Sequence, residues 1–155
     1  MNPKAFLAHT KKMAKSMAAV AKASVDVGLP SDKVGGKVYG DGMTILRVGA
    51  IHEFGAGNIP QRSFLRVPFI VNQKSINKAI AKQFESVMNG QKPAIALGRI
   101  GAIASNYSKG AFTSMGYGQW QDIKQSTKDA KGSAQPLIDT GILRGSITWA
   151  VRNAS

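Results

Sequence analysis

Hydrophobic and polar positions from residue 3 to about residue 25 repeat with the period of an amphipathic helix. The apolar residues follow one another at spacings of seven, four and three positions, and they form one stripe: Phe6, Met13, Met17 and Val20. Basic residues repeat along a different face of the same stretch: Lys4, Lys11, Lys15 and Lys22. The pattern therefore predicts a first helix with one apolar face and one basic face.

Two more helices are predicted in the middle of the chain. Pro68 is well placed to open the second helix, because proline is tolerated in the first turn. Its apolar face is made by Ile76, Ile80, Phe84 and Val87, and a basic row beside that face is made by Lys74, Lys78 and Lys82. Pro93 opens a third helix that is apolar over most of its circumference. We expect this third helix at the centre of the core or at a subunit contact.

Short strands are predicted on both sides of these helices. Residues 37–40 and 43–48 are β-type runs separated by Asp41-Gly42, a favoured two-residue hairpin turn. The second run leads into residues 50–55, where the pattern predicts a single helical turn that Gly55 ends. Residues 146–152 alternate like a strand. We therefore predict an α+β fold, with three helices packed on a small antiparallel sheet in a single domain of residues 1–155.

A polar segment separates the third helix from the last strand. Residues 110–135 are rich in Gly, Ser, Thr, Gln and Lys, and Tyr117 and Trp120 are their only large anchors. Such a long loop inside a compact domain is usually functional or mobile. We expect this loop to be mobile in the free protein and ordered in an assembly.

Composition limits the classes of protein that need to be considered. A chain of 155 residues can bury a core without metal or disulfides, and its lack of cysteine rules out both disulfides and thiolate metal ligands. Lysines interrupt the N-terminal segment, so we expect neither a signal peptide nor a membrane span. The formal charge of +13 favours contact with nucleic acid or with acidic protein surfaces.

Two short sequences invite a catalytic interpretation that the rest of the chain does not support. His52-Glu53 begins like the zinc motif H-E-x-x-H, but the second histidine is missing. Asp139-Thr140-Gly141 is similar to an aspartic protease sequence, but those enzymes need a paired carboxylate in a largely β fold. We expect Asp139 or Thr140 to cap a short turn, Glu53 to pair with Arg62 or Arg66, and Phe54 to pack inward. The sequence thus predicts no enzyme, metal, cofactor or small-molecule substrate.

Two segments resemble the tailed-bacteriophage virion-morphogenesis family, which includes neck and tail-completion proteins. The first segment matches the family pattern "hEFG" followed by "IPxRxFL" through Glu53, Phe54, Gly55, Pro60, Arg62, Phe64 and Leu65. The second matches "PLxDTGxLRxSI" through Asp139, Thr140, Gly141, Leu143 and Arg144. Trp120 stands where many members place a tryptophan. The resemblance covers about residues 40–70 and 115–150.

The resemblance implies a structural virion protein that completes the tail or joins it to the head. Its expected partners are further copies of itself, in a ring of six, and other neck or tail proteins such as a tail terminator or a head-completion protein. We expect it in the virion after assembly in the host cytoplasm. Contact with packaged DNA would be non-specific, since aromatic residues are too sparse for base stacking.

A different class of function remains open beside this one. The basic helix faces would also suit a nucleic-acid-binding protein without sequence preference. For either function, the candidate interaction residues are Lys11, Lys15, Lys74, Lys78, Lys82 and Trp120.

Overall fold

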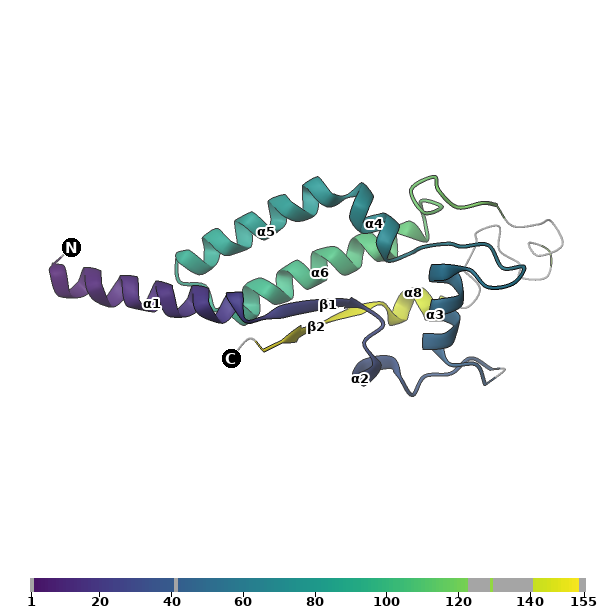
Figure 1. Cartoon of the computed structure of the whole chain (residues 1–155), viewed down its shortest axis with the longest axis horizontal. Coiled ribbons are helices and arrows are strands. Elements are labelled where there is room, and N and C mark those ends of the chain that lie inside the picture. The colour runs from purple at the N-terminus through teal and green to yellow at the C-terminus, as the bar shows by residue number, and fades with distance from the viewer. Residues whose placement is uncertain (1, 41, 123–128, 130–140, 154–155) are drawn as a thin grey trace.

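The computed structural model describes residues 2–40, 42–122, 129 and 141–153. Within these residues the chain forms seven helices and two strands, arranged in an elongated molecule from which the first helix projects (Figure 1). They are α1 Pro3–Ala21, β1 Ser24–Gly28, α2 Ser31–Val34, α3 Ile45–Phe54, α4 Arg66–Val71, α5 Gln73–Met88, α6 Pro93–Ala111, α8 Ile142–Ser146 and β2 Thr148–Arg152. The predicted combination of helices with a small antiparallel sheet is confirmed. The described part contains more helices than the three predicted, although α1, α5 and α6 are the long ones.

The sheet joins the two ends of the chain. β1 pairs antiparallel with β2, from Ser24 opposite Arg152 to Gly28 opposite Thr148. Arg152 also forms ion pairs with Asp26 and Asp32, each at 3.0 Å, so that β2 is tied to both β1 and α2. The last strand was predicted, whereas β1 was not, because the predicted first helix extended to residue 25 and the helix ends at residue 21.

The prediction of two strands at residues 37–40 and 43–48 was wrong. The described residues of this region form only an isolated bridge between Val38 and Thr44. Thr44 caps a helix instead, since its Oγ1 accepts a hydrogen bond from the backbone N–H of Arg47 at 3.2 Å. The residues expected in the second strand and in a single helical turn therefore make one ten-residue helix, α3.

The second predicted helix is divided in two. Pro68 lies inside α4 rather than at the start of a long helix, and Asn72 separates α4 from α5. The backbone N–H and the side-chain amide of Asn72 both donate to the carbonyl of Pro68, at 3.0 and 2.8 Å. The lysines of α5 are exposed, and the residues of its predicted apolar face are half-buried or buried: Ile76, Ile80, Phe84 and Val87.

Helix α6 lies at the centre of the molecule, and the prediction of its start at Pro93 is confirmed. It packs against both strands and against α1, α4 and α5. Gly101 permits the closest of these approaches: a Cβ atom added there would lie 2.4 Å from Cδ1 of Trp149. The apolar circumference of α6 is therefore explained by neighbours within the same chain.

Within the described residues, the core contains two hydrophobic clusters. The smaller cluster joins the long helices through Val20, Val87 and Ala96. The larger, here called the motif core, consists of Ile45, Phe64, Ala111, Phe112, Trp120, Leu143 and Ile147. Trp120 contacts Phe112 edge-on, with ring centroids 5.7 Å apart, and its indole N–H donates to the carbonyl of Ser63 at 3.3 Å. Trp120 is thus a core residue, and its assignment to an interaction surface is corrected.

Candidate functional site

The side chain of Glu53, at the end of α3, holds the segment that leads into α4. The residue is 4% exposed, and its carboxylate accepts five hydrogen bonds. Oε1 accepts from Ser63 Oγ at 2.7 Å, from the backbone N–H of Arg66 at 3.2 Å and from Arg66 Nε at 2.9 Å. Oε2 accepts from the backbone N–H groups of Phe64 and Leu65, both at 2.9 Å. A buried charge is stable here because donors surround it, and because it lies at the N-terminus of α4.

Further hydrogen bonds close the loop between α3 and α4. The backbone N–H of Arg62 donates to the carbonyl of His52 at 2.7 Å. Ser108 Oγ of α6 donates to the carbonyl of Phe64 at 2.6 Å. Phe64 is fully buried in the motif core. Hydrogen bonds from two helices consequently fix the loop: one to α3 through His52, and one to α6 through Ser108.

The two arginines of the first motif have different partners. Arg66 forms the ion pair with Glu53, which confirms one of the two pairings expected for this glutamate. Arg62 is buried and donates from Nη2 to the carbonyl of Gln121 at 3.4 Å. Burial lowers the pKa of Arg62, and the nearby charge of Asp122 opposes that shift. The side chain of Arg62 therefore links the loop to Gln121, the residue after Trp120, rather than to Glu53.

Phe54 does not pack inward, contrary to the prediction. Its side chain is 66% exposed, and the guanidinium of Arg66 lies 4.9 Å from the centroid of its ring. Gly55 follows with a φ of 77°, which turns the chain away from α3 and leaves Phe54 on the outside. Ile59, which is bridged to Ala56 across the same loop, is 41% exposed. The end of α3 and the loop that follows it thus present two apolar side chains to solvent.

The second motif reaches the same core as the first. Leu143 and Ile147 belong to the motif core together with Phe64, and α8 packs against α3 (Figure 1). Gly141 precedes α8 as its N-cap residue with a φ of 72°, and Arg144 is exposed. Asp139 and Thr140 lie outside the described residues, as do residues 123–128 and 130–135 of the loop predicted to be mobile. Two segments about eighty positions apart in the sequence therefore form one structural unit.

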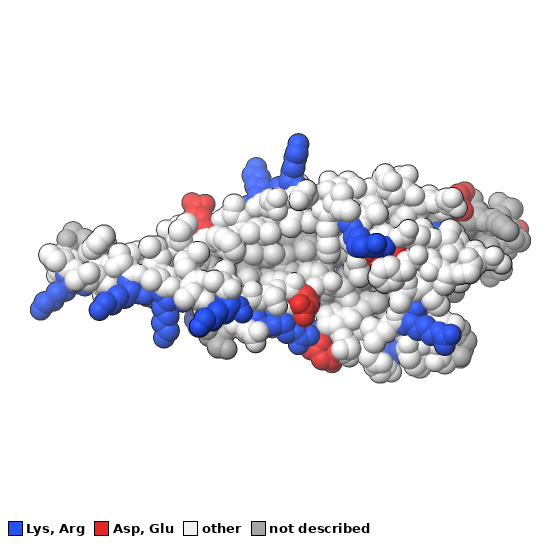
Figure 2. All heavy atoms as spheres, in the orientation of Figure 1, with Lys and Arg blue, Asp and Glu red and all other residues white. Residues whose placement is uncertain are grey.

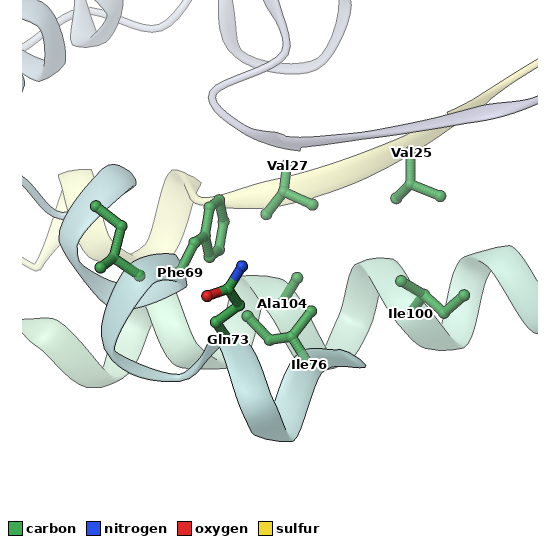
Figure 3. Close-up of a pocket in the computed structure, with 8 residues that line it drawn as sticks. Val25, Val27, Phe69, Gln73, Ile76, Ile100 and Ala104 are labelled. Carbon is green, nitrogen blue, oxygen red and sulfur yellow. The ribbon is translucent and has the colours of Figure 1, made fainter. Parts of the chain in front are cut away.

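An open apolar groove lies between β1, the α4–α5 corner and α6. It has a volume of about 440 Å³ and is lined by Val25, Val27, Phe69, Ile70, Gln73, Ile76, Ile100 and Ala104 (Figure 3). Gln73 is the only polar residue among the described residues that line it, and Ile70 is 72% exposed. Figure 2 shows this hollow as an uncharged area between charged groups of the neighbouring elements.

The predicted lysine rows lie on two separate exposed helix faces. Lys11 and Lys15 belong to α1, whereas Lys74, Lys78 and Lys82 belong to α5. Neither row lies close to the loop between α3 and α4, here called the Glu53 loop (Figure 1). Among the described residues, no group of three His, Cys, Asp or Glu side chains could hold a metal ion, and no helix is long and apolar enough to cross a membrane. The chain matches no protein-family model, no curated protein and no solved structure.

Proposed function

We propose that this chain is a structural protein of a tailed-phage virion that completes the tail or joins it to the head. The observation that carries the proposal is the meeting of the two phage-like segments in one core. Phe64 from the first segment and Leu143 from the second are buried together, and Trp120 lies beside them. A chance likeness of two separate segments gives no reason for them to pack against each other.

The exposed apolar surfaces support a role in assembly. Phe54 at the end of α3 and Ile59 in the following loop are exposed beside the hydrogen bonds of Glu53 that fix this loop, so little conformational entropy is lost when a partner covers them. The groove beside Ile70 is a second, different apolar surface. Ring assembly by head-to-tail contacts needs two such different surfaces on every subunit. We propose a ring of six copies, positioned at the neck between tail and head proteins.

The neighbours of this ring follow from its proposed place in the virion. A tail terminator would contact one face and a head-completion protein the other. The lysines of α5 are exposed, and they would suit an acidic surface on either neighbour. The work of the protein would then be mechanical and would involve no catalysed reaction.

A pair of phenylalanine substitutions tests whether the exposed loop is an assembly surface. Phe64→Ala removes a fully buried ring, so it should lower the free energy of unfolding by about 3–5 kcal/mol and yield misfolded or unincorporated protein. Phe54→Ala removes an exposed ring, so it should change that free energy by less than about 1 kcal/mol but block joining. Urea unfolding measures the first effect, and electron microscopy of phage complemented with each variant measures the second.

Val38→Ala is the matched control for Phe54→Ala, because Val38 is 54% exposed and lies outside the Glu53 loop. The control should fold normally and support joined particles. If the Phe54 variant also gives normal numbers of joined, infectious particles, its loop is not an assembly surface and this proposal fails at its main structural support.

A further inference from the structure

Three lysines of α1 and its C-cap residue Lys22 form a straight row, here called the α1 lysine row, on the side of the helix that faces solvent. Lys12 lies outside this row. At about 100° per residue, Lys4, Lys11, Lys15 and Lys22 fall within about 40° of one another around the helix axis. The row extends over eighteen positions, or about 27 Å at a rise of 1.5 Å per residue. All four side chains are exposed.

Packing on the opposite face of the helix determines the side to which this row points. Met13, Met17 and Val20 lie about 180° away from the lysines, and Met17 and Val20 pack in the helix cluster with α5 and α6. Because Met17 and Val20 hold the C-terminal part of the apolar face against the body, the basic face points outward, whereas Phe6 on the projecting part of the helix is 57% exposed. Figure 2 shows Lys and Arg atoms along one side of the projecting helix.

No acidic residue offsets the charge of this row. Helix α1 contains neither Asp nor Glu, and none of the four lysines of the row takes part in an ion pair within the described residues. The lysine row on α5 is shorter, since it extends only eight positions. It is also partly offset by an acidic residue, because Glu85 follows Lys82 one helical turn later. The α1 row is therefore the longer and the less neutralised of the two.

We propose that the α1 lysine row binds the phosphate backbone of nucleic acid without sequence preference, a property that goes beyond the proposed place in a ring and does not depend on it. A linear array of single positive charges complements a linear polyanion, and duplex DNA carries about eight phosphates per strand over 27 Å. Lysine contacts phosphate as a point charge, without the bidentate geometry by which arginine reads bases. The face has no aromatic residue on which a base could stack.

A membrane surface fits the same helix less well. Amphipathic helices bind membranes by burying their apolar face among the lipids. In α1 the C-terminal part of that face, Met17 and Val20, is already covered by α5 and α6, which leaves Phe6 as the one large residue of that face exposed among the described residues. An acidic protein would need an unusually long straight row of carboxylates to match four lysines over about 27 Å. Nucleic acid supplies such a row in every sequence.

Fluorescence anisotropy with a labelled duplex of about 30 base pairs and random sequence tests the proposal on the full chain. If each lysine neutralises one phosphate, the row contributes about −3.6 to the slope of log K against log salt concentration, a loss of about 150-fold between about 50 and 200 mM salt. The K4Q/K11Q/K15Q/K22Q variant should lose that contribution to the slope. The corresponding lysine-to-arginine variant keeps the charges and should retain binding.

The matched control is K74Q/K78Q/K82Q/K92Q, which removes four exposed charges from the same protein and leaves the same formal net charge of +9 (13 minus 4). The proposal predicts that this control keeps most of the affinity and slope. Equal losses in both glutamine variants would overturn it, because net charge alone would then explain binding. Unchanged binding by the α1 variant would overturn it too, as would tighter binding to polyglutamate or to phosphatidylserine vesicles than to the duplex.

Circular dichroism and size-exclusion chromatography of the α1 variant separate this proposal from the proposed function. The four exposed substitutions should leave helix content and assembly unchanged. A variant that assembles normally but no longer binds the duplex supports the lysine row. A wild-type protein that binds no duplex overturns the phosphate proposal and leaves the assembly role standing.

Discussion

Replacing Glu53 by glutamine keeps the size of the side chain and removes its charge. The amide nitrogen must then occupy one of the two carboxylate positions. At the Oε2 position it faces the backbone N–H groups of Phe64 and Leu65, and at the Oε1 position it faces the backbone N–H and Nε of Arg66. In either orientation two donors meet another donor instead of an acceptor.

The cost of this mismatch follows from the burial of the site. A buried donor without a partner costs about 1–3 kcal/mol, so two would cost about 2–6 kcal/mol. Leu65 and Arg66 are partly reached by water, which favours the lower part of that range. We expect Glu53→Gln to lower the free energy of unfolding by about 2–4 kcal/mol.

Urea unfolding followed by circular dichroism measures this difference, and Glu85→Gln is its control. Glu85 is an exposed residue of α5, so its substitution should change stability by less than about 0.5 kcal/mol. A Glu53→Gln variant as stable as this control would refute the conclusion that the carboxylate holds the loop.

Two further predictions concern packing and charge. Gly101→Ala should lower the free energy of unfolding by about 1–3 kcal/mol, because its Cβ would clash with Trp149. Gly98→Ala should leave this free energy unchanged or raise it by up to about 1 kcal/mol. Thermal unfolding distinguishes the two variants, and equal effects would contradict the close approach of Gly101 to Trp149. The hydrogen bond from Arg152 holds the pKa of Asp32 below its ordinary value of 3.8, so this pair stabilises the fold above that pH and its contribution disappears as the pH falls through the lowered pKa. An NMR titration should show the Asp32 pKa rising toward 3.8 in Arg152→Met, and an unchanged midpoint would contradict the pairing.

The sequence predicted the elements whose pattern is long or marked by proline. The spacing of Met13, Met17 and Val20 predicted the inner face of α1, and Pro93 marked the start of α6. Strand β1 was missed because it contains only two alternating apolar residues, Val25 and Val27, directly after a helix. That alternation was the available signal.

The errors around the candidate site have a different cause. Residues 43–48 contain β-branched side chains typical of a strand, but the cap from Thr44 and packing of Ile45 in the motif core favour a helix. The local sequence does not show which of the two phenylalanines, Phe54 or Phe64, is buried. The inward position of Phe64 and the outward position of Phe54 depend on how Glu53 closes the loop, which is a long-range geometric fact.

Electron microscopy of phage particles that carry a labelled copy of this chain tests the central claim most directly. A folded, functional labelled protein should be found as a single ring of density at the junction of head and tail. Particles made without the chain should then separate into DNA-filled heads and free tails. Label spread through the head interior or absent from finished particles, together with normal joining when the chain is deleted, would contradict the assignment to the neck.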